Sequence, residues 1–286
     1  MEKIKNFLKL IRVKHYIKNL VCFVPLIFSL NFTNYQLCIK AGIIFAAFCI
    51  ISSSIYIFND IFDIKDDILN KKNRPLAEGK ISISFANCIM LLFLILGLFI
   101  CAKINVFTLL AAIFYVVLNI FYTIYLKKIE IIDAICIAFG FILRILAGCG
   151  AIMVVPSPLV ILLTFFISMF FTFSKRRLEF CKEGIRQRKS VEKFNLELLN
   201  QFVCANAVLS IAFYFAYVMD NTVMERAQTS FLYISAIPFT IIIFRLLFLV
   251  NTEKQYTDPA EFLYRDKPVK LFFIIYFITL GLILII

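Results

Sequence analysis

Apolar runs of about 20 residues recur along the whole length of this 286-residue chain. One such run is the length that an α-helix needs to cross the hydrocarbon core of a bilayer. Hydrophobic residues make up 62% of the chain, whereas roughly 45–50% is usual in a soluble domain. We therefore predict an all-α, polytopic membrane protein in which residues 1–286 form a single domain. The runs predict nine spans, at residues 14–32, 39–60, 82–102, 105–126, 132–154, 158–174, 198–219, 230–250 and 269–286.

The basic residues predict the orientation of these spans. If the spans alternate across the membrane, the 30 Lys and Arg residues fall almost entirely on the side of the N-terminus. The exceptions are Lys40, Lys103 and Arg226 on the other side, and Arg144 and Arg245 within spans. Positive residues collect on the cytoplasmic side of membrane proteins, so we expect a cytoplasmic N-terminus. The same distribution explains the net charge of +12 by anionic lipid and anionic substrate, without nucleic acid.

An acidic cluster stands where the second span should meet water. Asn59, Asp63 and Asp67 are spaced i, i+4 and i+8, and Asp60 and Asp67 are seven apart, so each set lies along one helix face. Carboxylates this close repel one another unless a positive charge sits among them. Oxygen ligands without His or Cys suit Mg²⁺, which completes its shell with substrate phosphates. The cluster therefore predicts a phosphate-handling metal site, and the alternative is a solvated acidic turn.

Other polar residues gather toward the same side of the membrane. Arg74 follows the acidic cluster and precedes Pro75, so it is a candidate to meet phosphates held there. Tyr122 at the end of the fourth span is a candidate site residue or an interfacial aromatic. Asp133 opens the fifth span, where it is a candidate site residue or a partner of the helix dipole. Arg144, three turns further on, carries a charge into the membrane, where a functional role is the default interpretation.

Three consecutive basic residues follow the sixth span, namely Lys175, Arg176 and Arg177. Guanidinium groups bind phosphate in a bidentate manner, but a basic cluster beside a span is also an ordinary topology signal. The nine Cys residues are scattered singly and His15 is the only histidine. This pattern indicates apolar packing of the thiols and argues against zinc, haem and iron–sulfur sites.

Together these residues resemble the UbiA superfamily of intramembrane transferases. Its first aspartate motif, Asn-Asp-x-x-Asp-x-x-x-Asp, is matched by Asn59, Asp60, Asp63 and Asp67. Within the superfamily the chain most resembles the decaprenyl-phosphate phosphoribosyltransferase branch. The supporting segments are Arg12 to Asn19, Asn73 to Gly79, Tyr122 to Lys127, Phe141 to Gly148, Ser174 to Glu179 and Asp258 to Asp266.

The resemblance implies transfer of 5-phosphoribose from phosphoribosyl diphosphate to a polyprenyl phosphate, with release of pyrophosphate. Mg²⁺, or Mn²⁺ as an alternative, would be held by Asp60, Asp63 and Asp67. Asn59 would orient the metal shell, and Asp133 and Arg144 would join Asp60 and Asp63 in catalysis. The implied substrate contacts, besides Asn59 and Tyr122, are Lys18, Arg74, Lys127, Lys175, Arg176 and Arg177. The enzyme would lie in the bacterial inner membrane, supply cell-envelope glycan synthesis and be free to form a homo-oligomer.

Two alternatives remain open at this point. Prenyltransferases of the superfamily carry a second motif, Asp-x-x-x-Asp, after the sixth helix, whereas this chain has Lys-Arg-Arg-x-Glu there. An aromatic prenyltransferase that uses a polyprenyl diphosphate shares the first motif but needs the second. A transporter or lipid flippase would also fit nine spans with a buried Arg144, but the sequence lacks the paired Gly- or Pro-broken helices that mark two transporter halves.

Overall fold

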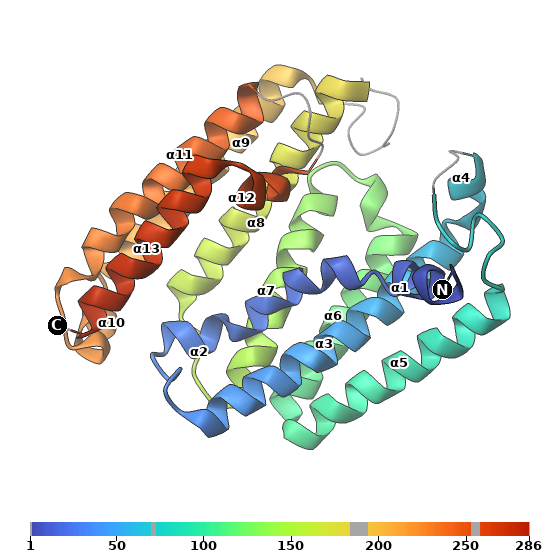
Figure 1. Cartoon of the computed structure of the whole chain (residues 1–286), viewed down its shortest axis with the longest axis horizontal. Helices are drawn as coiled ribbons and strands as arrows, with labels where there is room; N and C mark the ends of the chain where they lie inside the picture. Colours follow the sequence, from blue (N-terminus) through green and yellow to red (C-terminus); the bar gives the residue numbers. More distant parts are fainter. Residues whose placement is uncertain (1, 70–72, 184–193, 253–257, 286) are drawn as a thin grey trace. The chain divides into compact units, whose positions relative to one another are not determined.

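The computed structural model describes residues 2–69, 73–183, 194–252 and 258–285, and every regular element in these ranges is a helix (Figure 1). Eight of the helices are long and apolar enough to cross a membrane. This confirms an all-α, multi-pass membrane protein. The predicted count of nine spans is not confirmed, because the segment predicted to span at 14–32 forms no long α-helix among the described residues.

The chain divides into two compact units. The first comprises residues 1–125 and 143–156, the second residues 126–142 and 157–286, so that α7 contributes to both. The first unit contains α1 (Glu2–Leu10), the 3₁₀ helix η1 (Val13–Phe23), α2 (Val24–Phe28), α3 (Tyr35–Phe62), α4 (Ile64–Leu69), α5 (Ile83–Ile104), α6 (Val106–Ile124) and the end of α7 (Ile132–Ile152). The second contains η2 (Leu126–Lys128), the start of α7, α8 (Pro158–Glu183), α9 (Leu196–Val218), α10 (Asn221–Ala227), η5 (Phe231–Ser235), α11 (Ala236–Thr252), η6 (Pro259–Glu261), α12 (Phe262–Arg265) and α13 (Lys267–Ile285).

The 3₁₀ helix η1 lies along α3 with the opposite chain direction. A 3₁₀ helix has three residues per turn, so Tyr16, Asn19 and Cys22 share one face. Tyr16 hydrogen-bonds Ser53, Asn19 donates to Ser52, and Cys22 is buried in the core around α3. The segment predicted to span at 14–32 thus forms mostly a 3₁₀ helix, with a period of three in place of the α-helical period.

Glycine lets η1 approach α7 closely. A Cβ atom on Gly148 would lie 2.4 Å from the Cys22 carbonyl oxygen, which is backbone and cannot move aside cheaply. On its other face the same unit packs α3 against α5, with Phe48, Ile51 and Ala47 fully buried. Helix α3, which carries the acidic motif at its end, is therefore held by packing against α5.

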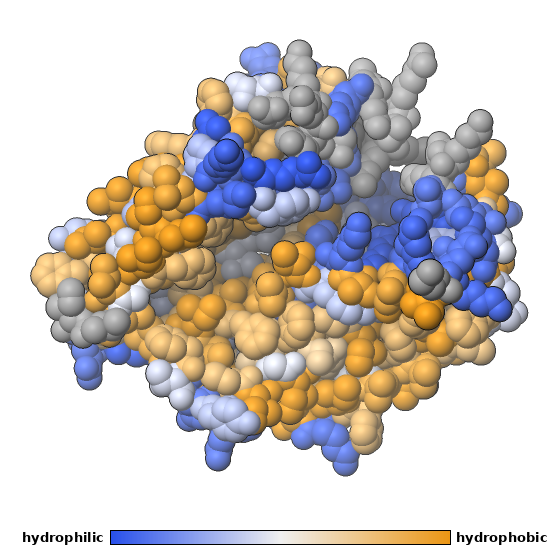
Figure 2. Space-filling view, in the orientation of Figure 1, coloured by the Kyte–Doolittle hydropathy of each residue, from blue (hydrophilic) through white to orange (hydrophobic). Residues whose placement is uncertain are grey.

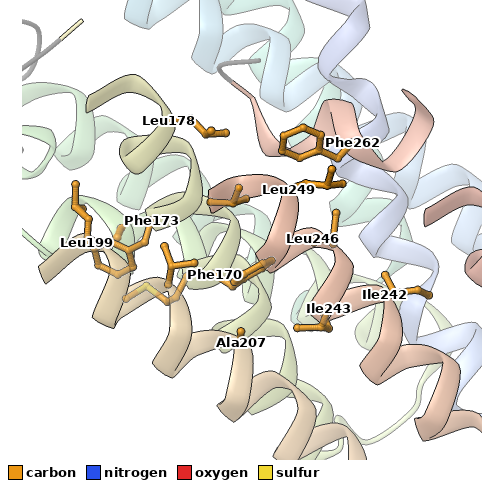
Figure 3. Close-up of a cluster of buried hydrophobic side chains, with 14 of the residues drawn as sticks. Phe170, Phe173, Leu178, Leu199, Ala207, Ile242, Ile243, Leu246, Leu249 and Phe262 are labelled. Atoms are coloured by element: carbon orange, nitrogen blue, oxygen red, sulfur yellow. The ribbon is translucent and has the colours of Figure 1, made fainter. Parts of the chain in front are cut away.

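The second unit has its own apolar core. Phe170 and Phe173 of α8 pack with Leu199 of α9 and with Leu246 and Leu249 of α11 (Figure 3). Phe173 and Phe202 stack with their ring centroids 4.8 Å apart. This core holds the part of α8 that carries the three consecutive basic residues.

The surface of the first unit separates polar from apolar side chains. Hydrophilic residues gather over α1 and α4, whereas hydrophobic ones cover the outer side of α5 (Figure 2). The exposed side chains of α5 include Leu92, Ile95 and Phe99, with 57%, 66% and 56% of their surface accessible. Such a surface suits acyl chains, so the polar face marks the end of the unit that meets water and headgroups.

Candidate functional site

The acidic motif spans a break between two helices. Helix α3 ends at Phe62, Asp63 caps it, and α4 begins at Ile64. The backbone nevertheless keeps the helical register, because Asp63 N donates to Asn59 O and Asp67 N donates to Asp63 O, each at 2.9 Å. The predicted stripe of Asn59, Asp63 and Asp67 is thus confirmed across the break.

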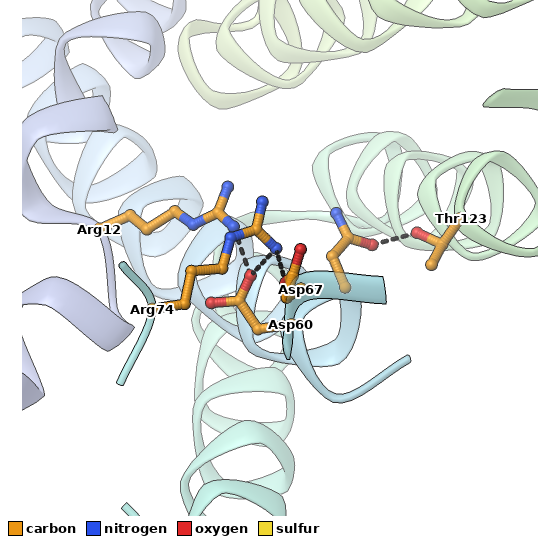
Figure 4. Close-up of polar contacts among 6 residues, drawn as sticks. Arg12, Asp60, Asp67, Arg74 and Thr123 are labelled. Atoms are coloured by element: carbon orange, nitrogen blue, oxygen red, sulfur yellow. Dashed lines mark hydrogen bonds and ion pairs between the residues drawn. The ribbon is translucent and has the colours of Figure 1, made fainter. Parts of the chain in front are cut away.

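Asp60 and Asp67 share one arginine. Arg74 Nη1 lies 2.8 Å from Asp60 Oδ1 and 2.5 Å from Asp67 Oδ2 (Figure 4). The two carboxylates are 2% and 1% exposed, so their charges are compensated by this guanidinium rather than by bulk water. The sequence-based expectation that Asp60 and Asp67 face the same way, with Arg74 close by, is therefore confirmed.

A second guanidinium, that of Arg12, also binds Asp60 Oδ1. Arg12 stands between α1 and η1 with φ 53° and ψ 50°, a left-handed conformation that is uncommon outside glycine. Its guanidinium also lies 4.9 Å from the ring centroid of Tyr56, in cation–π contact. Arg12 was not among the predicted site residues, because its partner is 48 positions away in the sequence. The only sequence signal was its place in the Arg12 to Asn19 segment.

The remaining predicted residues near this end take different positions. Asn59 accepts a hydrogen bond from the Thr123 hydroxyl, which ties the motif to the end of α6. The neighbouring Tyr122 and Lys127 are half-buried, while Lys18 on η1 is exposed. The structure thus joins Asn59, Asp60, Asp67 and Arg74 in one cluster with Arg12 and Thr123.

The chemistry of the donor set fits a hard divalent cation, since the motif offers carboxylate and amide oxygens only. No group of three or more His, Cys, Asp or Glu side chains is already gathered around a metal position in the part of the chain that the structure describes. Instead, guanidinium groups bind carboxylate oxygens of Asp60 and Asp67. The cluster therefore contains ligands that suit a divalent cation, together with arginines that already pair with them.

Arg144 lies in a buried polar chain inside the first unit. It is 5% exposed, its Nε donates to Asn19 Oδ1 at 2.7 Å, and its Nη2 donates to the Tyr115 hydroxyl at 2.8 Å. Asn19 in turn donates to Ser52 at 3.1 Å. Arg144 therefore connects α7 to η1 and α6 by hydrogen bonds to neutral groups.

Asp133 has a different partner from Arg144, although both belong to α7. It forms an ion pair with Arg176 of α8, and both side chains are 1% exposed. The Arg176 guanidinium also lies 5.3 Å from the ring centroid of Phe173. Asp133 and Arg144, predicted to be three turns apart on one helix, therefore bind different partners, Arg176 in one case and Asn19 with Tyr115 in the other.

The other two basic residues of α8 are also engaged. Arg177, 8% exposed, donates to Asn200 Oδ1 at 2.6 Å and to the Val250 carbonyl. The Lys175 side chain is 40% exposed, and its Nζ lies 3.8 Å from Asp258 Oδ2. Of the three, Lys175 is the best placed to reach a dissolved phosphate, and the phosphate contacts predicted for Arg176 and Arg177 stay predictions.

A further ion pair joins α11 to the start of α13. Arg245 Nη2 donates to Asp266 Oδ2 at 2.9 Å, and Asp266 Oδ1 accepts the backbone N–H of Val269 at the helix N-terminus. The hydrogen bond from Arg245 lowers the pKa of Asp266, which lies just outside the spanning part of α13. The Asp258 to Asp266 segment is therefore tied to the helical core of the second unit.

The amino-acid sequence was compared with those of known protein families and known proteins. The sequence model of the UbiA prenyltransferase family matches residues 24–274. The decaprenyl-phosphate phosphoribosyltransferase of Mycolicibacterium smegmatis is 25% identical over 97% of this chain and 92% of its own length. The protein of the same name from Corynebacterium glutamicum is 29% identical over 86% of this chain and 77% of its own length.

The fold has a solved counterpart. The structure of a UbiA homologue from Archaeoglobus fulgidus bound to GPP and Mg²⁺ superposes with a TM-score of 0.70, covering 98% of this chain and 96% of the other. The two sequences are 16% identical, so the likeness concerns the fold alone.

Proposed function

This chain belongs to the UbiA prenyltransferase family and is a membrane-embedded transferase, and from that premise we propose that it transfers 5-phosphoribose from phosphoribosyl diphosphate to a polyprenyl phosphate. The observation that carries the choice of donor is the similarity to two phosphoribosyltransferases over most of the chain. The Lys-Arg-Arg sequence in α8 agrees with it, since an enzyme that binds a prenyl diphosphate through a second metal would need carboxylates there.

In the proposed reaction an oxygen of the lipid phosphate attacks C1 of the ribose. The bond between C1 and the diphosphate oxygen breaks, and pyrophosphate leaves with the bonding electrons. No general base is needed, because the attacking phosphate is already anionic. Negative charge grows on the leaving group and the ribose becomes cation-like, so fixed positive charges near the diphosphate supply most of the acceleration.

The acidic end of α3 supplies the proposed diphosphate site. Asp60, Asp63 and Asp67 would hold Mg²⁺, or Mn²⁺, which when bound would neutralise charge on the departing diphosphate. Arg74 is already 2.8 Å or less from two of these carboxylates and would reach a phosphate next to them. Asn59, held by Thr123, would keep the ligand stripe in register.

Other predicted residues take proposed supporting roles. Arg144 would hold η1 in place through Asn19, so that Lys18 on η1 is presented to phosphate. Tyr122, Lys127 and Lys175 are accessible enough to contact substrate directly. Asp133 and Arg176 would support the reaction indirectly, through the ion pair that joins α7 to α8. We also propose a bacterial inner membrane location, a cytoplasmic N-terminus and a product used in cell-envelope glycan synthesis.

A direct assay tests the donor and the acceptor together. Purified protein in detergent is given Mg²⁺, phosphoribosyl diphosphate labelled in the ribose, and decaprenyl phosphate. The expected result is a labelled lipid that keeps the 5-phosphate, with one pyrophosphate released per lipid formed. Omission of the lipid should stop pyrophosphate release.

A parallel reaction tests the alternative function. Geranyl or farnesyl diphosphate is supplied with 4-hydroxybenzoate in place of the two proposed substrates. Pyrophosphate release in this reaction, and none from phosphoribosyl diphosphate, would identify an aromatic prenyltransferase instead.

A further inference from the structure

Two arginines from distant parts of the sequence converge on a single carboxylate oxygen. Arg12 and Arg74 both bind Asp60 Oδ1, and Arg74 also bridges to Asp67. The carboxylates are almost fully buried, whereas the arginine side chains are 21% and 26% exposed. The positive groups therefore lie on the solvent side of the acids, where an entering anion would meet them first.

The chain holds Arg12 in this position at a conformational cost. Its left-handed backbone is one that non-glycine residues adopt rarely and that tends to occur at functional sites. Neighbouring contacts enforce it, since Ser53 Oγ donates to the Ile11 carbonyl at 2.8 Å and the Arg12 carbonyl accepts the His15 N–H at 2.8 Å. The side chain then packs over Tyr56 and ends at Asp60.

The arrangement sets an electrostatic condition on metal binding. Two guanidinium groups already neutralise the charges of Asp60 and Asp67. A divalent cation placed among the same oxygens would be repelled by both arginines and would compete with them for the carboxylates. In a buried, weakly screened environment such like-charge repulsion is substantial. A diphosphate removes the conflict, because it offers the arginines new acceptors and adds the negative charge that the metal requires.

We propose that Arg12 and Arg74 are exchangeable counter-ions, which bind Asp60 and Asp67 when the site is empty and bind the diphosphate when metal enters. Arg12 thereby becomes a substrate-binding residue in addition to Arg74. Metal and diphosphate bind as a coupled pair, so neither binds well alone. This inference deepens the proposed function in that it requires a diphosphate-bearing donor, but not specifically a phosphoribosyl one.

Thermodynamic linkage makes the coupling measurable from either ligand. The factor by which pyrophosphate raises metal affinity equals the factor by which metal raises pyrophosphate affinity. Couplings of this kind commonly amount to roughly 5–150-fold. Removal of one counter-ion should strengthen binding of the metal alone and weaken the coupling, which is the opposite of what loss of a purely structural residue would do.

The test uses the full chain in detergent and Mn²⁺ as a paramagnetic probe. Binding is followed by electron paramagnetic resonance, with and without inorganic pyrophosphate, and an ion buffer fixes free Mn²⁺ because pyrophosphate chelates it. In the wild type, pyrophosphate should raise Mn²⁺ affinity at least about fivefold. Arg12→Gln should bind Mn²⁺ alone at least about fivefold more tightly than the wild type, and should gain less from pyrophosphate.

Two further variants make the result interpretable. Arg74→Gln should behave like Arg12→Gln, and it serves if Arg12→Gln fails to fold. Arg226→Gln, at an exposed position in α10, removes the same charge elsewhere and should leave both affinities unchanged. Unchanged or weaker binding of Mn²⁺ alone in both Arg12→Gln and Arg74→Gln would overturn the proposal.

The outcome is independent of the donor assay. Coupled binding without turnover of phosphoribosyl diphosphate would remove the proposed donor and leave the counter-ion exchange in place. Turnover of that donor by an enzyme that binds Mn²⁺ equally well with and without pyrophosphate would do the reverse.

Discussion

Asp60 is the side chain on which the contacts of the acidic motif converge. Asp60→Asn keeps the shape of the side chain but removes the charge that binds two guanidinium groups. We predict that this variant loses measurable turnover, because it lacks one carboxylate of the proposed metal site. The wild type should also lose turnover in excess EDTA, because the proposed metal is held by oxygen ligands with no softer donors nearby. Turnover is measured as pyrophosphate release, and folding as the Tm in detergent.

Asp66→Asn is the matched control for this substitution. Asp66 belongs to the same cluster but is exposed on α4, so its replacement should leave most of the activity. Full turnover of the wild type in EDTA, or of Asp60→Asn in Mg²⁺, would show that the motif is not a catalytic metal site.

Arg144 tests whether a buried charge in α7 serves the reaction. Arg144→Ala removes a cation from a spanning helix, which should ease insertion by about 2.5–3.5 kcal/mol. It also takes a donor away from Asn19 and Tyr115, and one such buried group left unsatisfied costs about 1–3 kcal/mol. We predict a well-expressed protein with little or no turnover. An active variant with a raised Tm would show that Arg144 is tolerated rather than required.

The sequence could reveal the residues of the acidic motif but not all of their partners. Helical spacing alone places Asp60 above Asp67, and the shared Arg74 confirms it. Arg12 could not be found in this way, because an ion pair between the start of the chain and the end of α3 depends on how η1 packs. For the same reason, spacing within α7 could not show that Asp133 and Arg144 bind different partners.

At the scale of secondary-structure elements, the ion pair between Asp133 and Arg176 joins the start of α7 to the end of α8. Removal of one member of a buried pair leaves the other charge uncompensated and typically costs about 3–5 kcal/mol. We predict that Arg176→Ala lowers the Tm in detergent strongly. The double variant Asp133→Leu with Arg176→Met should recover much of the loss, since apolar pairs often replace buried ion pairs at little cost.

Kinetics separate this role from a direct phosphate contact. If Arg176 contacts a substrate phosphate, loss of that contact should raise KM in the single and double variants alike. The increase should be about ten- to hundredfold for a charge-assisted bond of 1.5–3 kcal/mol. A purely architectural role predicts a KM near that of the wild type in the stabilised double variant. The buried position of Arg176 favours the second result.

The connection between α11 and α13 predicts a pH dependence of stability. Because Arg245 lowers the pKa of Asp266 in the folded state, this carboxylate stabilises the fold fully above its unfolded pKa of about 3.9. The contribution is lost as pH falls through the lower, folded-state pKa. The Tm difference between the wild type and Asp266→Asn should therefore be largest near neutral pH and shrink below about pH 4. A constant difference from pH 7 to pH 3 would contradict this origin.

Element types were predictable to the extent that the chain follows α-helical periodicity. Helices α3 to α13 include eight long apolar helices that the sequence identified by length and hydropathy alone. The sequence predicts a span at 14–32 but not the 3₁₀ geometry of η1, because Tyr16, Asn19 and Cys22 follow a period of three and place polar groups against α3. A 3₁₀ helix of this length is uncommon, so rules based on local sequence patterns do not predict it.

At the scale of the whole molecule, the route of η1 and α2 decides how many times the chain crosses the membrane. Arg12, before η1, binds Asp60 near the end of α3, whereas Leu26 in α2 packs with Ala41 near its start. The eleven residues of η1 and five of α2, at about 2.0 and 1.5 Å each, cover about 30 Å, the thickness of the hydrocarbon core. These contacts support a ninth crossing made by a helix that is mostly 3₁₀.

The count has a consequence for the two ends of the chain, since nine crossings place them on opposite sides of the membrane and eight place them on the same side. We predict a cytoplasmic N-terminus and an external C-terminus. In a bacterial host, green fluorescent protein fused before Met1 should fluoresce and alkaline phosphatase fused after Ile286 should be active, while the exchanged fusions should be silent. Fluorescence of both the N-terminal and the C-terminal fusions, with active transferase, would place the two ends on the same side and show that η1 and α2 do not cross the membrane.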